Sequence, residues 1–183
     1  RGEHARAQAI LDENILALES VTHPEVERVL VGALQNRAVT CLSTAPRKAL
    51  DDLERATRIH RALSHGDERA EWERAEAKIL MSAATATRRL GRPHEAVRMQ
   101  TEAIMHLERL GDAASPEDRS QLASLCLNKA NAVEQLGLER AAVGLYDRAM
   151  DIWQGLVADG HAEHAGDVAK ATVYRASTLQ ALS

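Results

Sequence analysis

Two histidines three positions apart form the spacing in this chain that most suggests metal binding. His161 and His164 would share one face if residues 160–164 were helical, and Glu163 could assist them. No third or fourth ligand follows at a recognisable spacing, and there is no His-Glu-x-x-His motif. We therefore interpret this segment as a polar turn and predict no bound metal. We also expect four other histidines to be solvent-exposed: His60, His65, His94 and His106.

The two cysteines are candidate nucleophiles, but they have a simpler interpretation. Cys41 and Cys126 each fall at an apolar position of a predicted helix, so we expect small core residues. Two cysteines so far apart in the sequence do not form a disulfide framework, so we expect a protein of the reducing cytoplasm. Carboxylates adjacent in sequence, as at 51–52, point in different directions from a helix and so do not form an acid–base pair. The sequence also contains no glycine-rich phosphate loop. We predict neither an enzyme nor a cofactor.

Composition narrows the class of protein further. The net charge is −4 and the aromatic content is 2% with no Phe, while Ala, Leu, Glu and Arg are abundant. These features favour helix over a β-sandwich or barrel. No basic block supports nucleic-acid binding, and no apolar stretch approaches the roughly 20 residues that span a bilayer. The chain opens without Met, so we expect a piece of a longer cytoplasmic protein.

Small residues recur at a fixed period along the chain. Ala38, Ala84, Ala130 and Ala176 are each separated by 46 residues. Three further series share the period to within one residue and run through Gly2, Ala49, Ala96 and Ala142; through Ala9, Ala56, Ala103 and Ala149; and through Leu16, Leu63, Leu110 and Leu156. Small residues permit close helix crossings, so we expect the alanines of these series to be nearly fully buried. A period of 20–50 residues indicates a solenoid.

Local signals place the helices. All four prolines stand where a helix is expected to begin, Ser115 is a plausible N-cap with Asp118 three residues on, and Gly91 and Gly137 follow the ends of two predicted helices. We predict eight helices, at 3–19, 24–44, 46–64, 68–90, 93–110, 117–136, 139–157 and 165–182. They alternate between A helices, which carry the first Ala series, and B helices, which carry the second and third. The A helices are therefore those at 24–44, 68–90, 117–136 and 165–182.

The third repeat carries a family resemblance. Residues 125–137 resemble the first helix of a tetratricopeptide repeat, and residues 138–152 resemble its second helix, with Ala142, Tyr146 and Ala149 at the small, aromatic and small positions. Residues 76–110 and 34–63 match more loosely. The resemblance implies an all-α, right-handed α-solenoid of antiparallel helix pairs. It divides the chain into an unpaired B helix at 1–20, repeats at 24–64, 68–111 and 116–158, and an unpaired A helix at 165–182.

The departures from that family concern length. The usual unit has 34 residues, and the longer unit here resembles those of kinesin light chain and of bacterial signalling and conflict proteins. The unpaired helices at the ends should each leave an apolar face uncovered. For the last helix that face comprises Val168, Ala171, Ala176 and Leu179. We expect it to be covered by other domains of the parent protein, or by self-association.

The resemblance also implies a binding surface, since A helices of such arrays line a groove that holds partner peptides. An Asn stands two positions before the small Ala at Asn36 and Asn128, and Ser82 and Tyr174 occupy the equivalent positions. An amide can both donate to and accept from an extended backbone. The expected groove residues are Gln35, Asn36, Lys78, Ser82, Thr85, Arg88, Asn128, Asn131, Lys170 and Tyr174.

These expectations lead to one main functional hypothesis and one alternative. The main hypothesis is a non-enzymatic protein-interaction module of a bacterial protein, whose Lys and Arg side chains favour an acidic partner segment. The alternative is a ligand-sensing or regulatory segment of a signalling or defence protein that controls a fused effector domain. Solvated A-helix faces without a partner would explain the same residues.

Overall fold

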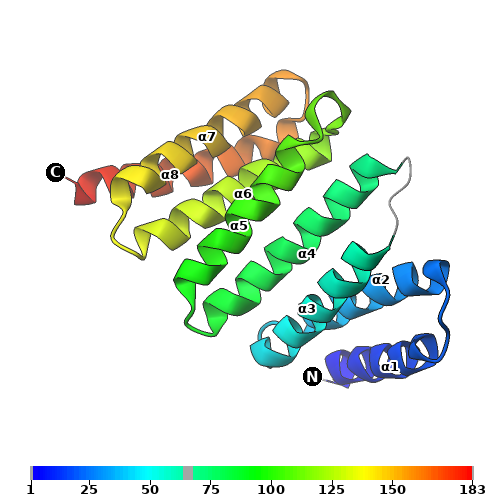
Figure 1. The fold of residues 1–183 in the computed structure, drawn as a ribbon. Helices are drawn as coiled ribbons and strands as arrows, with labels where there is room; N and C mark the ends of the chain where they lie inside the picture. The colour runs from blue at the N-terminus through cyan, green and yellow to red at the C-terminus, as the bar shows by residue number, and fades with distance from the viewer. Residues whose placement is uncertain (1, 64–67, 183) are drawn as a thin grey trace. The chain divides into compact units, whose positions relative to one another are not determined.

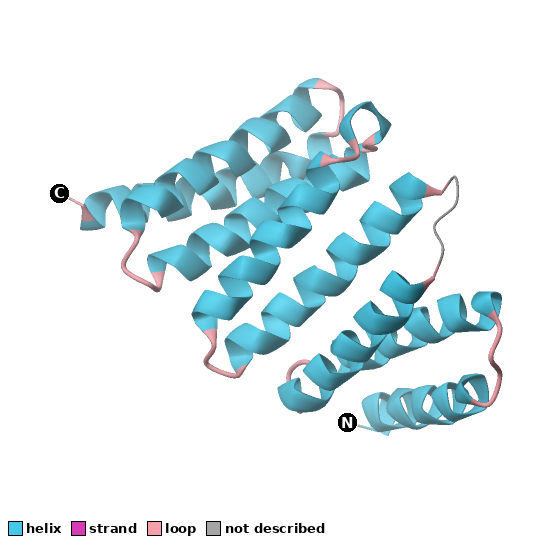
Figure 2. Cartoon of the chain, in the orientation of Figure 1, coloured by secondary structure: helices cyan, strands magenta, loops and turns pink. Residues whose placement is uncertain are grey.

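The chain is an all-helical protein, as its composition and periodicity predict. The computed structural model describes residues 2–63 and 68–182. Over these residues the regular structure is α-helix with two short 3₁₀ helices, and no strand is present (Figure 2). His65 lies outside the described residues. Among the helices described, none is both long enough and apolar enough to cross a membrane.

The helices agree with the predicted ranges to within three residues at each end (Figure 1). They are α1 (Gly2–Glu19), α2 (Pro24–Cys41), α3 (Pro46–Ala62), α4 (Arg69–Arg89), α5 (Pro93–Glu108), α6 (Pro116–Glu134), α7 (Glu139–Ala158) and α8 (Ala165–Ala181). The 3₁₀ helices η1 (Gly111–Ala113) and η2 (Ala162–His164) precede α6 and α8. The A helices are thus α2, α4, α6 and α8.

The helix ends follow the local signals in the sequence. At the start of α6, Asp118 N donates to Ser115 Oγ at 3.2 Å, and Ser115 N donates to Asp118 Oδ2 at 2.9 Å. This reciprocal pair satisfies two backbone donors that the first turn leaves without a partner. Gly91 and Gly137 both have φ 74°, the left-handed conformation in which a helix commonly ends and which glycine adopts without a Cβ clash.

Contacts divide the chain into two compact units, at 1–96 and 97–183, with the boundary inside α5. In the first unit, α2 packs against both α1 and α3, α3 packs against α4, and the A helices α2 and α4 also touch. In the second unit, α7 packs against α6, α8 and η2. In each unit, helices that follow one another in the sequence therefore pack together, from α1 to α4 in the first unit and from α6 to α8 in the second.

The repeated small residues form the core, as predicted, wherever they lie inside the array. Ala38, Ala84 and Ala130 are at most 1% exposed, and so are Ala49, Ala96, Ala142, Ala56, Ala103 and Ala149. Leu63, Leu110 and Leu156 are buried with them. A side chain this small lets two helix backbones approach closely, which explains why alanine recurs at these positions.

The terminal members of the same series are exposed. The prediction of burial is therefore wrong for Ala9, whereas the exposure of Ala176 agrees with its predicted place on the uncovered face of the last helix. Ala9 and Leu16 on α1 and Ala176 on α8 are exposed, Leu16 by 69%. They lie on the outermost helices of their units, where no further helix faces them. The expected uncovered face of α8 needs a correction as well, because Ala171 is 0% exposed on the helix that packs against α7. Leu179, by contrast, is 40% exposed.

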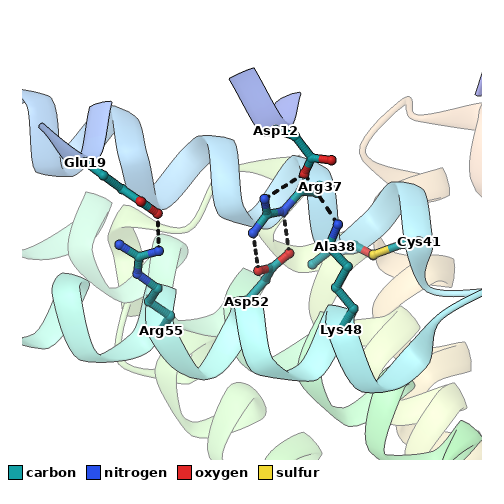
Figure 3. Close-up of polar contacts among 8 residues, drawn as sticks. All are labelled: Asp12, Glu19, Arg37, Ala38, Cys41, Lys48, Asp52 and Arg55. Carbon is teal, nitrogen blue, oxygen red and sulfur yellow. Dashed lines mark hydrogen bonds and ion pairs between the residues drawn. The ribbon is translucent and has the colours of Figure 1, made fainter. Parts of the chain in front are cut away.

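An ion-pair cluster joins α1, α2 and α3 (Figure 3). The Arg37 guanidinium donates to Asp52 through Nε at 2.8 Å and through Nη2 at 2.6 Å, and to Asp12 Oδ1 through Nη1 at 2.7 Å. Lys48 Nζ lies 3.4 Å from the same Asp12 oxygen. A second pair, Arg55 with Glu19, also links α3 to α1 (Figure 3). Polar contacts thus link α1 to both α2 and α3.

Candidate functional site

In the first unit, the expected groove residues lie on two A helices that touch. Asn36, Lys78 and Arg88 are exposed, whereas Gln35, Ser82 and Thr85 are half-buried. The Thr85 hydroxyl donates to the carbonyl of Met81 within its own helix at 3.1 Å. Asn36 and Lys78 form no side-chain hydrogen bond or ion pair with any described residue, so their polar groups are available to a ligand.

In the second unit, the expected residues lie on α6 and α8. Asn128, Lys170 and Tyr174 are exposed, and Asn131 is half-buried. The Lys170 ammonium lies 5.9 Å from the centroid of the Tyr174 ring, within range of a cation–π attraction. Asn128 forms no side-chain hydrogen bond among the described residues and, like Asn36, remains available.

Asn131 has a structural partner that sequence reasoning missed. Tyr146 is fully buried on α7, and its hydroxyl donates to Asn131 Oδ1 at 2.6 Å. The same hydroxyl lies 3.0 Å from Glu134 Oε2, while the Thr178 hydroxyl donates to Glu134 Oε1 at 2.7 Å. Burial, with Glu134 beside it, raises the pKa of Tyr146 and keeps the phenol protonated as a donor. These bonds connect α6, α7 and α8, so Asn131 contributes to the core of its unit.

A cleft of about 240 Å³ opens in the first unit where α2 meets the end of α3 and the start of α4. Its walls combine apolar, aromatic and charged side chains from these three helices. They are Arg28, Val31, Gly32, Gln35, His60, Leu63, Glu68, Glu71, Trp72 and Ala75. Of the predicted groove residues, this cleft includes Gln35 alone; its other polar walls were not anticipated from the sequence.

His60 forms part of this cleft, so the prediction of a solvated histidine is wrong. Its ring stacks on Trp72 with the centroids 5.2 Å apart and the planes at 19°, and only 8% of the residue is exposed. His60 Nε2 also lies 3.3 Å from the Trp72 carbonyl oxygen and 3.7 Å from Glu76 Oε2. Trp72 follows His60 by twelve residues and lies near the start of α4. It is one of two tryptophans in the chain and was the sequence feature that could have indicated an aromatic partner for His60.

His106 also departs from the sequence prediction. It is 4% exposed on α5, whereas His94 on the same helix is exposed as expected. Twelve residues correspond to a rotation of about 120° around an α-helix, so the two histidines occupy different faces. Their spacing along the sequence therefore gave no reason to assign them the same environment.

A second hollow, of about 330 Å³, lies beside η2 and includes both His161 and His164. There, Ser120 Oγ and Asp167 Oδ2 approach His164 Nδ1 at 3.5 and 3.1 Å. A catalytic serine and the carboxylate that orients a histidine must bind opposite ring nitrogens, and here both meet the same one. The Ser120 hydroxyl also accepts a bond from Trp153 Nε1 at 3.4 Å. These contacts suit the predicted polar turn.

The cysteines lie in the core, as predicted. Cys41 and Cys126 are free thiols and at most 1% exposed. Burial raises the pKa of both thiols, which disfavours the nucleophilic thiolate. Neither sulfur is therefore poised for covalent chemistry.

Comparison with known proteins identifies a relative in fold. No protein-family model matches the chain, and no curated protein matches it. Among solved structures, the crystal structure of BtubC (BKLC) from P. vanneervenii is similar over 99% of this chain and 67% of that chain. The TM-score is 0.77 and the sequence identity is 19%. At this identity the likeness shows a shared helical fold.

Proposed function

We propose that the chain is a non-enzymatic protein-interaction module that holds an extended partner segment against its A helices. The observation that carries this proposal is that the side chains of Asn36 and Asn128 are exposed and, among the described residues, unbonded. Each is exposed on an A helix, two positions before a buried alanine of the repeat, and has no side-chain hydrogen bond among the described residues. Polar side chains that recur in register without a structural partner are suited to binding from outside.

Amides suit this task chemically. Each can accept a backbone N–H and donate to a backbone carbonyl of an extended peptide, whatever the sequence of that peptide. Lys78 and Arg88 are exposed on α4, and neither forms an ion pair with a described residue. They would favour acidic residues in the part of the segment that they meet. The resemblance to tetratricopeptide repeats supports the same function.

The test is capture of partners by the wild-type chain and by a variant with Asn36→Ala and Asn128→Ala. Each lost hydrogen bond, at ~0.5–1.5 kcal/mol, should weaken binding at its own asparagine by about two- to tenfold. Asn131 is left unchanged because its oxygen accepts from Tyr146. Asn14→Ala is the matched control, since Asn14 is an exposed amide on the B helix α1.

Equal helicity of all three proteins by circular dichroism establishes that only surface groups have changed. Loss of partners in the double variant, with capture retained by Asn14→Ala, supports the proposal. Unchanged capture by the double variant would assign the binding surface elsewhere.

A further inference from the structure

The cleft between α2 and α4 has the size and composition of a site for one side chain. Its volume of about 240 Å³ lies below the ~300–1,000 Å³ of most cofactor and small-molecule sites. The apolar part of the wall consists of Val31, Leu63 and Ala75, and the Trp72 indole also lines the cleft. A long side chain with an aliphatic stem would find apolar contact along most of its length.

The Gln35 amide gives the cleft an unmet hydrogen-bonding group. Its Nε2 is buried and has no hydrogen-bond partner among the residues that the structure describes. A buried donor without an acceptor is costly, so such groups are rare in folded proteins and often mark a place where something binds. The backbone carbonyl of a segment crossing the cleft would supply the acceptor.

Charge decides which side chain fits. Glu71 lines the cleft, is exposed, and forms no ion pair with a described residue. Glu68 is the second carboxylate. Among the described lining residues, the one Lys or Arg is Arg28, whose Nη2 lies 3.9 Å from a Glu68 oxygen. Arg28 and Glu68 balance each other, which leaves the Glu71 charge available. A carboxylate beside an indole attracts a cation.

We infer that this cleft binds an arginine side chain of an extended partner segment. The guanidinium meets Glu71, the stem lies along Trp72, and the backbone carbonyl of the segment accepts from Gln35. Arginine is preferred over lysine because its planar group binds a carboxylate through two parallel N–H groups, whereas an ammonium acts as a point charge. The inference rests on the proposed function and names one residue of the partner, whatever acidic residues meet Lys78 and Arg88.

The probe is an acetylated and amidated pentapeptide, Ala-Ala-Arg-Ala-Ala, added to the ¹⁵N-labelled chain. We expect it to shift the NMR signals of the Trp72 indole N–H and the Gln35 side-chain amide. Trp153 is 2% exposed in the second unit and serves as the internal reference, because its indole signal should stay in place. Peptides with Glu or Leu at the central position should bind at least tenfold more weakly.

Two variants test the contacts. Glu71→Gln should weaken binding of the arginine peptide by about tenfold, the loss of affinity that corresponds to one charge-assisted hydrogen bond. Gln35→Ala should weaken the binding of every extended peptide that enters the cleft. Glu54→Gln removes an equal charge from an exposed site on α3 and should leave the affinity unchanged.

Absence of a Trp72 shift with the arginine peptide would overturn the inference, and so would equal binding of the Glu or Leu peptide. The two proposals fail separately. If Asn36→Ala with Asn128→Ala abolishes partner capture but Glu71→Gln does not alter any binding, the module stands and the arginine site does not. If the double variant captures partners unchanged while Glu71→Gln weakens the arginine peptide, the arginine site stands and the assignment of the asparagines does not.

Discussion

The Tyr146 hydroxyl donates to Asn131 Oδ1 across the interface of α7 and α6, at 2.6 Å. This bond explains how a residue placed by its spacing in a binding groove serves instead to hold two helices together. It also places a phenol in the core at a position where the repeat resemblance calls for an aromatic. Stability measurements can therefore separate the roles of Asn131 and Asn128.

Removal of this hydroxyl by Tyr146→Phe should destabilise the second unit by about 1 kcal/mol, because Asn131 and Glu134 would lose a donor while half-buried. The measurement is urea unfolding followed by circular dichroism. Tyr174→Phe is the matched control, since Tyr174 is 37% exposed and its hydroxyl forms no hydrogen bond with a described residue. Equal stability of the two variants would show that the Tyr146 bond contributes nothing.

Arg37→Met should be strongly destabilising. Asp52 is 6% exposed, and this change leaves its carboxylate buried without its guanidinium partner. Breaking a buried ion pair from one side costs about 3–5 kcal/mol. Chemical denaturation should show a loss of that order in the free energy of unfolding. Arg47→Met, which removes an exposed arginine of α3, should change it by less than about 1 kcal/mol.

The contribution of Asp12 should depend on pH. Hydrogen bonding from Arg37 holds the folded-state pKa of Asp12 below its usual value, with Lys48 acting in the same direction. The stabilisation is therefore fully present above the unfolded pKa of ~3.9 and is lost as the pH falls through the lower folded value. Asp12→Asn should lower the melting temperature at pH 7, and its difference from wild type should shrink below about pH 4. A difference that is constant from pH 7 to pH 2.5 would contradict this assignment.

Ala130→Leu should destabilise the chain by roughly 1–3 kcal/mol, because Ala130 is 0% exposed and a larger side chain forces the neighbouring helices apart. Ala141→Leu provides the comparison at an exposed position of α7. Thermal unfolding of both variants measures the effect. A fully stable Ala130→Leu would show that the repeated alanines are not needed for close packing.

The outer face of α8 should promote self-association of the chain. Val173 is 65% exposed and Leu179 is 40% exposed, with the exposed Ala176 between them in sequence. Sedimentation velocity over a range of concentrations should show association that Val173→Lys with Leu179→Lys reduces. Thr172→Lys, a charge added at an exposed polar position of the same helix, should reduce it less. A wild-type chain that stays monomeric at high concentration would contradict the expectation.

Local chemistry in the sequence determined the helices and most of the core. Proline at helix starts, the Ser115–Asp118 pair and the glycines at 91 and 137 act within one or two turns, so their effect can be read without knowing the fold. The 46-residue alanine period can also be read from the sequence, because each alanine marks a helix crossing within its own repeat. The same residue in the next repeat then implies the same crossing. For that reason Ala38, Ala84 and Ala130 were correctly placed in the core.

Only the tertiary structure decided which polar side chains are free to bind a partner and which are bonded to neighbouring helices. Asn128 and Asn131 are three residues apart on one helix and look equivalent in sequence, yet Asn131 faces a tyrosine from another helix. His60 is buried because Trp72 of the next helix stacks on it, and Arg37 is held by carboxylates of two other helices. In each case the partner lies more than ten residues away along the chain. Helical periodicity specifies the face that a residue occupies; the environment of that face depends on the neighbouring helix and on the side chains it supplies.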